Sequence, residues 1–277
     1  MKPPPFEYVR PESLDEALSL LDEDAKPLAG GQSLVPMLNM RLVRPTRLVD
    51  LNRVPGLDRV VAENGTVRIG ALVRQRTLED CALPLVVQAL PHLGHYVTRN
   101  RGTVGGSLAH ADAAAELPLC LVVLGGSVVT RSARGQREIP AEDFFVTHFT
   151  TALAPDELVV DTLWPAPGPG WGFAFEELSQ RHGDFGLAMA ACALRLEHGC
   201  IAEARVGIGS VVERPTLVET ALVGESVTEE LARETGVRAA EPLTLFGNLH
   251  APAEYQRRLT AVLVERAVLR AYAEALS

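Results

Sequence analysis

Cysteine is scarce in this chain. Its 277 residues include four cysteines, Cys81, Cys120, Cys192 and Cys200, and no two of them have C-x-x-C spacing. That spacing is the usual signal for a zinc ribbon or an iron–sulfur cluster, and a disulfide scaffold packs more cysteines into a much shorter chain. We therefore expect small buried thiols and a protein of the reducing cytoplasm.

Long apolar runs are also missing. No stretch approaches the ~18 residues that a membrane-spanning helix requires. Residues 1–6 (MKPPPF) have no apolar core of the kind found in secretory signals. The sequence therefore predicts neither a membrane span nor a secretory signal.

Basic residues are in the minority, with 26 Lys and Arg against 35 Asp and Glu. This balance disfavours a nucleic-acid partner. The acidic excess is uneven, because residues 1–110 carry 13 basic and 12 acidic residues and the rest carry 13 and 23. The N-terminal part is therefore the better host for an anionic ligand. The hydrophobic fraction of 47% and the charged fraction of 22% are those of a globular protein, and the length suggests two domains.

The common nucleotide-binding and hydrolase motifs are absent. The sequence contains no G-x-G-x-x-G after a strand, no G-x-x-x-x-G-K-[ST], no G-x-S-x-G and no H-E-x-x-H. These absences argue against a Rossmann dinucleotide fold, a P-loop NTPase, an α/β-hydrolase and a zincin.

Two glycine-rich loops are present nonetheless, at residues 29–34 (AGGQSL) and 101–107 (RGTVGGS). Paired glycines let backbone N–H groups approach an anion, and a following helix start adds unpaired donors. Ser33, Thr103 and Ser107 add hydroxyl groups. We expect the two loops to hold a diphosphate from two sides; the alternative is two strained turns without a ligand.

The first 55 residues predict a βαβαβ-like unit. Ser13 and Glu16 form a capping box at the start of a helix. A strand is expected at residues 26–29, a helix at 34–42 and a strand at 47–51.

Further along the chain the pattern alternates between hairpins and helices. Expected elements are a hairpin at 57–72 with its turn at Asn64-Gly65, a helix from Thr77 to Ala89, a helix at 113–124, a hairpin at 127–139 and a strand at 158–163.

Residues 165–170 (PAPGPG) form the clearest linker. Strands are expected after it at 188–196 and 202–208, and a long helix with Pro252 near its first position ends the chain. The apolar stripe predicted for that helix consists of Leu259, Val262, Leu263, Val268 and Leu269.

Segments that match a known family occur in order along essentially the whole chain. They are residues 29–34 with Arg44-Pro45 and 48–51 (LVDL), residues 99–112 (RNRGTVGGSLAHAD) continued by 115–118 (AELP), and residues 181–185 (RHGDF). On these segments the chain resembles the FAD-binding (medium) subunit of the molybdenum hydroxylases, a family that includes the flavoprotein of aerobic carbon monoxide dehydrogenase and the flavin part of xanthine dehydrogenase.

This resemblance implies an α+β fold. FAD would lie between two α+β subdomains of the vanillyl-alcohol oxidase and p-cresol methylhydroxylase type. A C-terminal domain like that of the carbon monoxide dehydrogenase flavoprotein, an antiparallel sheet plus helices, would follow. We place the FAD-binding domain at residues 1–168, with subdomains at about 1–56 and 57–168, and the C-terminal domain at 172–277.

The resemblance also places the FAD-binding positions of the family on this sequence. They fall on Lys26, Pro27, Leu28, Ala29, Gly30, Gly31, Gln32, Ser33, Leu34, Thr103, Val104, Gly105, Gly106, Ser107, Glu116 and Val159. Glu116 would accept hydrogen bonds from ribose or ribityl hydroxyls. Val159 would be the aliphatic residue that packs on the flavin, at the end of the strand before the linker.

The sequence departs from the family at two positions. Ala113 stands where the family usually has Pro, and Glu176 stands where some members carry Lys. A basic FAD contact at Glu176 is therefore not expected. Arg181 and Asp184 are expected to form either an ion pair that closes the C-terminal domain on the flavin or a purely structural pair.

The resemblance implies an oxidoreductase subunit with no substrate-oxidising residue and no metal of its own. A large subunit with the molybdenum cofactor would oxidise the substrate, and a small subunit with two [2Fe-2S] clusters would carry electrons to FAD. The acceptor would be a quinone, NAD or oxygen, and the assembly a dimer of heterotrimers. Two alternatives remain: a stand-alone FAD-dependent oxidoreductase of the same fold, and an assembly subunit that has lost its flavin.

Overall fold

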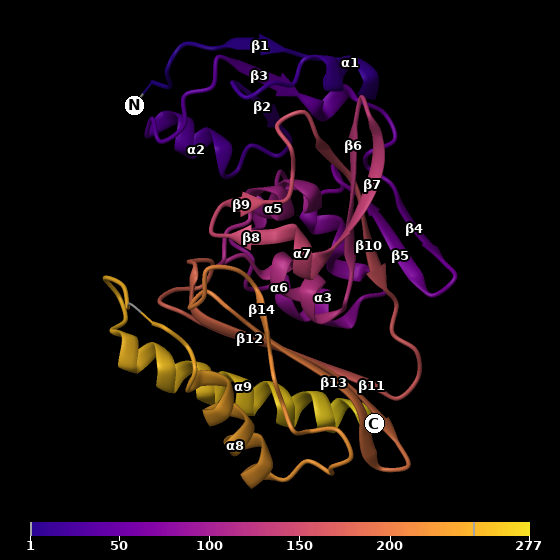
Figure 1. Cartoon of the computed structure of the whole chain (residues 1–277), viewed down its shortest axis with the longest axis vertical. Coiled ribbons are helices and arrows are strands. Elements are labelled where there is room, and N and C mark those ends of the chain that lie inside the picture. The colour runs from indigo at the N-terminus through magenta and orange to yellow at the C-terminus, as the bar shows by residue number, and fades with distance from the viewer. Residues whose placement is uncertain (1, 246) are drawn as a thin grey trace.

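The computed structural model describes residues 2–245 and 247–277. Figure 1 shows a small N-terminal sheet with two helices, a middle sheet accompanied by short helices, and a C-terminal sheet backed by two longer helices. The predicted α+β fold class is confirmed.

The N-terminal unit is a three-stranded parallel sheet with strand order β1-β3-β2. Its elements are β1 (Glu7–Val9), α1 (Leu14–Ser19), β2 (Ala25–Leu28), α2 (Leu34–Asn39) and β3 (Arg47–Asp50). The predicted βαβαβ arrangement is confirmed. Because β2 and β3 are adjacent and parallel, with Leu28 opposite Asp50, the residues that follow these two strands emerge at the same edge of the sheet.

The helix ends of this unit differ in detail from the prediction. Ser13 Oγ accepts a hydrogen bond from the Glu16 N–H at 3.1 Å, which is the predicted N-cap. The Glu16 carboxylate, however, accepts from the Glu12 N–H at 2.8 Å rather than from Ser13. The helix predicted to reach residue 42 ends at Asn39, because Arg41 has the left-handed backbone angle φ 60°.

The middle sheet has five antiparallel strands in the order β4-β5-β10-β6-β7. They are β4 (Val60–Glu63), β5 (Thr66–Gly70), β6 (Ser127–Ser132), β7 (Gly135–Pro140) and β10 (Leu158–Pro165). Both predicted hairpins are confirmed, and Asn64 and Gly65 form the tight turn of the first with φ angles of 51° and 74°. The strand before the linker, β10, pairs with β5 and β6 and so lies at the centre of the sheet.

Short helices and two short strands accompany this sheet. They are η1 (Leu51–Arg53), η2 (Gln75–Asp80), α3 (Pro84–Ala89), α4 (Tyr96–Arg99), α5 (Val104–His110), α6 (Glu116–Val123), α7 (Ala141–Phe144), β8 (Phe145–Thr147) and β9 (Thr150–Thr151). All eight residues of α6 are buried.

Two helix predictions in this region are wrong at their boundaries. The helix predicted from Thr77 to Ala89 is a 3₁₀ turn followed by a separate helix, because Pro84 cannot continue a helix but is well suited to the first turn of a new one. The helix predicted from Ala113 begins at Glu116, since Asp112 Oδ1 accepts from the Ala114 N–H at 2.9 Å and holds a turn there.

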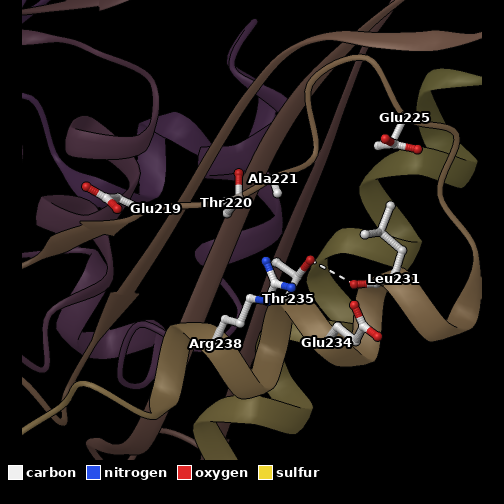
Figure 2. Close-up of a pocket in the computed structure, with 8 residues that line it drawn as sticks. All are labelled: Glu219, Thr220, Ala221, Glu225, Leu231, Glu234, Thr235 and Arg238. Atoms are coloured by element: carbon white, nitrogen blue, oxygen red, sulfur yellow. Dashed lines mark hydrogen bonds between the residues drawn. The ribbon is translucent and has the colours of Figure 1, made fainter.

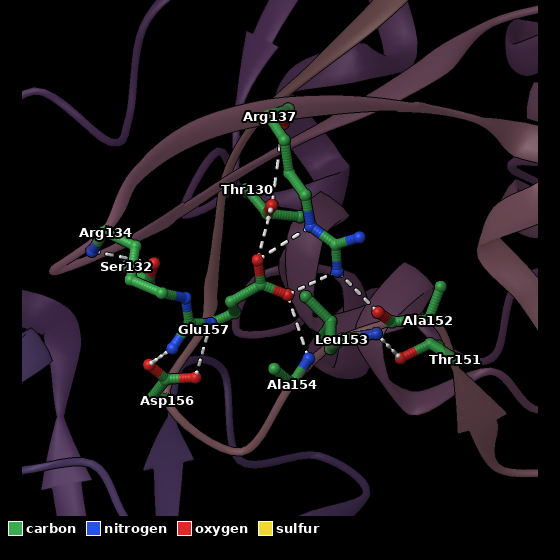
Figure 3. Close-up of polar contacts among 10 residues, drawn as sticks. All are labelled: Thr130, Ser132, Arg134, Arg137, Thr151, Ala152, Leu153, Ala154, Asp156 and Glu157. Atoms are coloured by element: carbon green, nitrogen blue, oxygen red, sulfur yellow. Dashed lines mark hydrogen bonds and ion pairs between the residues drawn. The ribbon is translucent and has the colours of Figure 1, made fainter.

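An ion pair supports the segment that leads into β10. The Arg137 guanidinium donates to both carboxylate oxygens of Glu157, at 2.7 and 2.6 Å, and to the Ala152 carbonyl at 2.6 Å. The Ala154 N–H donates to Glu157 at 2.8 Å (Figure 3). Burial tends to raise the pKa of Glu157, but these hydrogen bonds hold the pKa below its usual value.

The C-terminal sheet is antiparallel with strand order β11-β12-β13-β14. Its elements are β11 (Trp171–Ser179), β12 (Gly186–Glu197), β13 (Cys200–Gly209), β14 (Thr216–Val218), α8 (Glu229–Ala240) and α9 (Ala253–Ala275). The predicted turn at His198-Gly199 is confirmed by φ angles of 53° and 83°. The predicted stripe of α9 is wrong at Val262, which is 41% exposed, whereas Val264 is buried. None of the helices in residues 2–245 and 247–277 is both long and apolar enough to cross a membrane.

The side chains of β12 alternate between two cores. Met189, Ala191 and Ala193 belong to the core shared with the middle sheet, α3 and α6, whereas Ala190 and Cys192 belong to the core under α8 and α9. This period of two is what a strand buried on both faces requires. The C-terminal sheet is therefore packed directly on α3 and on α6, the helix that begins with Glu116.

Candidate functional site

The first glycine loop connects β2 to α2. Gly31 has φ 74°, a conformation that favours glycine. The loop closes through the Val35 N–H, which donates to the Gly31 carbonyl at 3.0 Å. Across the described part of the chain, no recorded hydrogen bond is donated by the backbone N–H groups of residues 30–33. These donors are therefore available to an anion, as the sequence predicts.

The second glycine loop uses its backbone donors internally. The Val104 N–H donates to the Val73 carbonyl at 3.0 Å and the Gly105 N–H to the Ala71 carbonyl at 2.9 Å. The Gly106 N–H donates to Thr103 Oγ1 at 3.1 Å, which caps α5. Within the described residues the first loop thus has amides without a recorded partner, whereas Val104, Gly105 and Gly106 of the second loop use theirs internally, and diphosphate binding by either loop stays a prediction.

Gly105 has a packing role instead. A Cβ atom at this position would lie 2.5 Å from Ala71 Cβ and 2.7 Å from Ala71 Cα. Glycine allows α5 to lie directly on the end of β5, and Gly106 in the first turn of α5 lies close to Ala29 of the first loop. Thr103 is 2% exposed and its hydroxyl group caps α5, so the second loop serves to hold α5 against the first loop.

The structure brings the two loops into contact. A Cβ atom built on Gly30 would lie 2.3 Å from the Arg101 carbonyl oxygen and 2.9 Å from Gly102 Cα. Ala29 Cβ lies 3.7 Å from the corresponding position at Gly106. Residues about 70 positions apart in sequence thus form one continuous surface of small residues and backbone.

The side chains of Asn52 and Arg74, which sequence reasoning missed, form a polar network that connects the two loops. Asn52 Nδ2 donates to the Ala29 carbonyl at 2.9 Å, and Arg74 Nη2 donates to Asn52 Oδ1 at 2.6 Å. Arg74 Nη1 donates to the Arg101 carbonyl. The available signal was topological, since a polar residue just after β3 must lie beside the loop that follows the neighbouring parallel strand.

Glu116 is the first residue of α6 and is 7% exposed. Burial, followed by the charge of Glu177, raises the pKa of Glu116 to about 8. No other side chain in the described ranges is recorded as a hydrogen-bond donor to its carboxyl group. A buried carboxyl group without such a donor is suited to the hydroxyl groups of a ligand, as predicted for ribose or ribityl.

Glu177 of β11 is a second acidic group that sequence reasoning missed. Both of its carboxyl oxygens and the Ser210 hydroxyl oxygen are buried without a hydrogen-bond partner. A Cβ atom at Gly186 would lie 3.0 Å from Glu177 Cδ and 3.1 Å from Ser210 Oγ, so the two groups share one small region. Burial raises the pKa of Glu177 to about 7. The C-terminal sheet thus adds polar groups close to Glu116.

The remaining predicted positions are placed as follows. Lys26 is exposed on β2, and Pro27 and Leu28 are half-buried. Val159 is the second residue of β10, not at its end as expected, and is 6% exposed in the core beside the middle sheet. Glu176, at the position of the family lysine, pairs with Arg270 of α9.

The predicted ion pair between Arg181 and Asp184 does not form within residues 2–245 and 247–277. The two residues are joined by a backbone turn, in which the Asp184 N–H donates to the Arg181 carbonyl at 3.0 Å. Both side chains are exposed, where an ion pair gains little over hydration. Gly183, with φ 84°, packs this turn against His95 of the middle region.

A separate hollow of about 170 Å³ lies between α8 and residues 219–225 (Figure 2). Its lining includes the acidic residues Glu219, Glu225 and Glu234, with Arg238 at one side. Acidic walls repel the phosphates of a dinucleotide. This hollow does not fit the predicted cofactor.

Two family models match consecutive parts of this chain. Residues 4–167 match the family model of the FAD binding domain in molybdopterin dehydrogenase, and residues 173–271 match that of the CO dehydrogenase flavoprotein C-terminal domain. The sequence is 41% identical to the 6-hydroxypseudooxynicotine dehydrogenase complex subunit alpha of Paenarthrobacter nicotinovorans, covering 98% of this chain and 96% of that protein.

Solved structures are similar over their whole length. The match to quinoline 2-oxidoreductase from Pseudomonas putida 86 has a TM-score of 0.96 and 36% identity and covers 100% of both chains. The match to carbon monoxide dehydrogenase from Hydrogenophaga pseudoflava has a TM-score of 0.95 and 33% identity and covers 99% of both chains.

Proposed function

Because the chain belongs to the FAD-binding medium subunits of the molybdenum hydroxylases, we propose that it receives electrons from the [2Fe-2S] clusters of a small partner subunit and delivers them to an external acceptor. The substrate is oxidised on a large partner subunit that holds the molybdenum cofactor. FAD connects one-electron carriers with two-electron acceptors such as a quinone, NAD or oxygen.

The juxtaposition of the two glycine loops carries this proposal. The first loop offers unused backbone donors, and the second loop lies against it through Arg101 and Gly106. We assign FAD binding to residues 26–34 and 103–107, to Glu116 and to Val159. Within this set, the amides of the first loop bind the diphosphate, Glu116 accepts hydrogen bonds from sugar or ribityl hydroxyls, and Val159 provides apolar packing.

We further propose two domains, residues 1–168 for FAD binding and residues 172–277 as the C-terminal flavoprotein domain. The FAD-binding domain divides into subdomains at about 1–56 and 57–168. Separate sheets in the three segments support this division.

The assembly that we propose is a dimer of heterotrimers in the cytoplasm. Support for a reducing compartment comes from the four cysteines, all of which are free thiols. Cys120 and Cys192 are fully buried, which suits small apolar packing residues, whereas Cys81 is half-buried and Cys200 is exposed, so the expectation of buried thiols is wrong for Cys200.

The decisive experiment is purification of the native complex through a tag on this chain. We expect one FAD per chain, molybdenum and iron on co-purifying large and small subunits, and no substrate oxidation by this chain alone. A chain that purifies with FAD and oxidises a substrate without partners would instead support the stand-alone flavoenzyme. A native complex in which this chain holds no FAD would contradict the proposal.

A further inference from the structure

Arg74 lies where β5 leads into η2, between the two glycine loops. Its guanidinium donates to Asn52 Oδ1 at 2.6 Å through Nη2 and to the Arg101 carbonyl through Nη1. Asn52 in turn donates to the Ala29 carbonyl at 2.9 Å. One continuous set of hydrogen bonds therefore runs from the first loop to the second.

The anchored carbonyls control the direction of the adjacent amides. The Ala29 C=O and the Gly30 N–H belong to one planar peptide unit and point in opposite directions. Once Asn52 holds the carbonyl, the Gly30 N–H is directed away from Asn52, and it is one of the donors without an internal partner. The network therefore orients a donor of the proposed diphosphate site without touching the ligand.

The same contacts fix the distance between the loops. Gly30 approaches the Arg101 carbonyl so closely that a Cβ atom would lie 2.3 Å from the oxygen. That carbonyl is the acceptor for Arg74 Nη1. A planar guanidinium is suited to this task because its nitrogens reach two acceptors at a set separation, which the single ammonium of Lys cannot do.

The groups around Arg74 indicate that its guanidinium serves to hold the two loops together. It is half-buried, and no ion pair to a carboxylate is recorded for it in the described part of the chain. Burial, and then the neighbouring charge of Arg101, lower the pKa of Arg74, while Asp50 opposes this effect. The guanidinium is held by neutral acceptors on both sides.

We propose that Arg74 and Asn52 are positioning residues that hold the two glycine loops in one arrangement and so preform the FAD site. This rests on the assignment of the loops to FAD in the proposed function. Neither residue is required to contact FAD.

The test measures the FAD dissociation constant of the full-length apoprotein for Arg74→Met, Arg74→Lys, Asn52→Ala and the double variant of Arg74→Met with Asn52→Ala. Arg68→Met is the matched control, because Arg68 lies on β5, six residues before Arg74, and pairs with Asp161 at 3.0 Å on an exposed face. We expect Arg74→Met and Asn52→Ala each to weaken FAD binding about tenfold or more, since both remove the partly buried hydrogen bond from the Arg74 guanidinium to Asn52 Oδ1. Arg74→Lys should not restore affinity, the double variant should be no weaker than Arg74→Met, and the control should bind within about twofold of wild type.

Two further readouts separate positioning from general stability. The rise in Tm on adding FAD should shrink in the variants, and amide exchange of residues 28–34 in the apoprotein should accelerate while exchange in the β12 core stays unchanged. Full rescue by Arg74→Lys, or affinity within about twofold of wild type in both single variants, overturns the inference while leaving the proposed function intact. If Arg74→Met does not fold, Asn52→Ala decides the question. A wild-type apoprotein that takes up no FAD overturns both.

Discussion

Gly30 lies against the backbone of Arg101 so closely that any side chain at position 30 would collide with the Arg101 carbonyl oxygen, which lies 2.3 Å from the ideal Cβ position. This contact joins two loops that the sequence places about 70 residues apart. The close contact between the two loops therefore requires glycine at position 30, because the atom it lies against is a backbone carbonyl oxygen.

Gly30→Ala should separate the two loops and abolish retention of FAD during purification. The overpacking should also lower the free energy of unfolding by about 1–3 kcal/mol. FAD content measured by flavin absorbance checks the first effect, and denaturant unfolding checks the second. Gly168→Ala is the control, because a Cβ atom at Gly168 meets nothing within 4 Å. Wild-type FAD content in Gly30→Ala would show that the loops are not held in this contact.

Gly105→Ala should lower the stability of the folded apoprotein. The added Cβ would lie 2.5 Å from Ala71 Cβ and 2.7 Å from its Cα. The apoprotein should therefore lose about 1–3 kcal/mol of stability, and Gly105→Val should lose more. Thermal unfolding of the apoprotein is the measurement. An apoprotein of Gly105→Val as stable as wild type, but unable to bind FAD, would restore the direct phosphate contact that the sequence pattern suggests.

The stability of the apoprotein should fall as pH rises from about 4.5 to about 8. The pKa of Glu116 is raised from 4.5 to about 8, by burial first and then by the charge of Glu177, and burial raises that of Glu177 from 4.5 to about 7. Over this range the folded chain holds protons that the unfolded chain has released, so the free energy of unfolding decreases with pH. Denaturant unfolding at several pH values tests this, and Glu116→Gln combined with Glu177→Gln should flatten the profile. A flat wild-type profile would contradict the environment assigned to both carboxyl groups.

FAD affinity should rise with pH over the upper part of the same range. A hydroxyl group that donates to Glu116 stabilises the ionised carboxylate, so FAD binding lowers the pKa of Glu116 and releases a proton. The dissociation constant should therefore be smaller at about pH 8.5 than at about pH 6.5. Titration of the apoprotein in two buffers of different ionisation enthalpy measures the proton release directly. If Glu116→Gln releases as many protons on FAD binding as wild type does, the protons come from a group other than Glu116.

Arg137→Met should destabilise the protein without changing FAD affinity. Glu157 is buried, with 8% of its surface exposed, and the substitution removes the guanidinium that it is paired with. Because Arg137 is about half exposed and solvent screens the pair, we expect a loss of about 1 kcal/mol at neutral pH. The pKa of Glu157 is lowered in the fold, so the stability from this pair is present above about 4.5 and is lost as pH falls through the lowered value. Unfolding curves at neutral and acidic pH measure the difference, which should be larger at neutral pH.

Local patterns predicted many elements because short-range physics determines them. The Ser13 cap, the Asn64-Gly65 turn and the βαβαβ order each depend on neighbouring residues, and all are found in the structure. The misplaced helix boundaries near Arg41, Pro84 and Asp112 also have local causes, but one failure arises from a second segment. The stripe of α9 was misassigned at Val262 because the rotation of a helix on a sheet is decided by the sheet.

In the candidate site, too, the residue types could be predicted from the sequence, whereas their roles could not. Its residue types were apparent from the sequence, since paired glycines, hydroxyl residues and an acidic residue suit a dinucleotide, and the ordered family motifs named FAD. The roles of those residues depend on contacts between distant segments. Gly105 faces Ala71, Asn52 and Arg74 bridge the loops, and Glu177 comes from another sheet.

Amino-acid order alone thus established the cofactor class, the family and the alternation of strands and helices, because each is encoded in residues close together along the chain. Which amides remain free for a ligand, and which carboxyl groups are buried near each other, followed from tertiary packing. Hydrogen bonding and desolvation depend on what lies within a few ångströms in space, and at the candidate site those neighbours come from segments as far apart as Ala29 and Gly106.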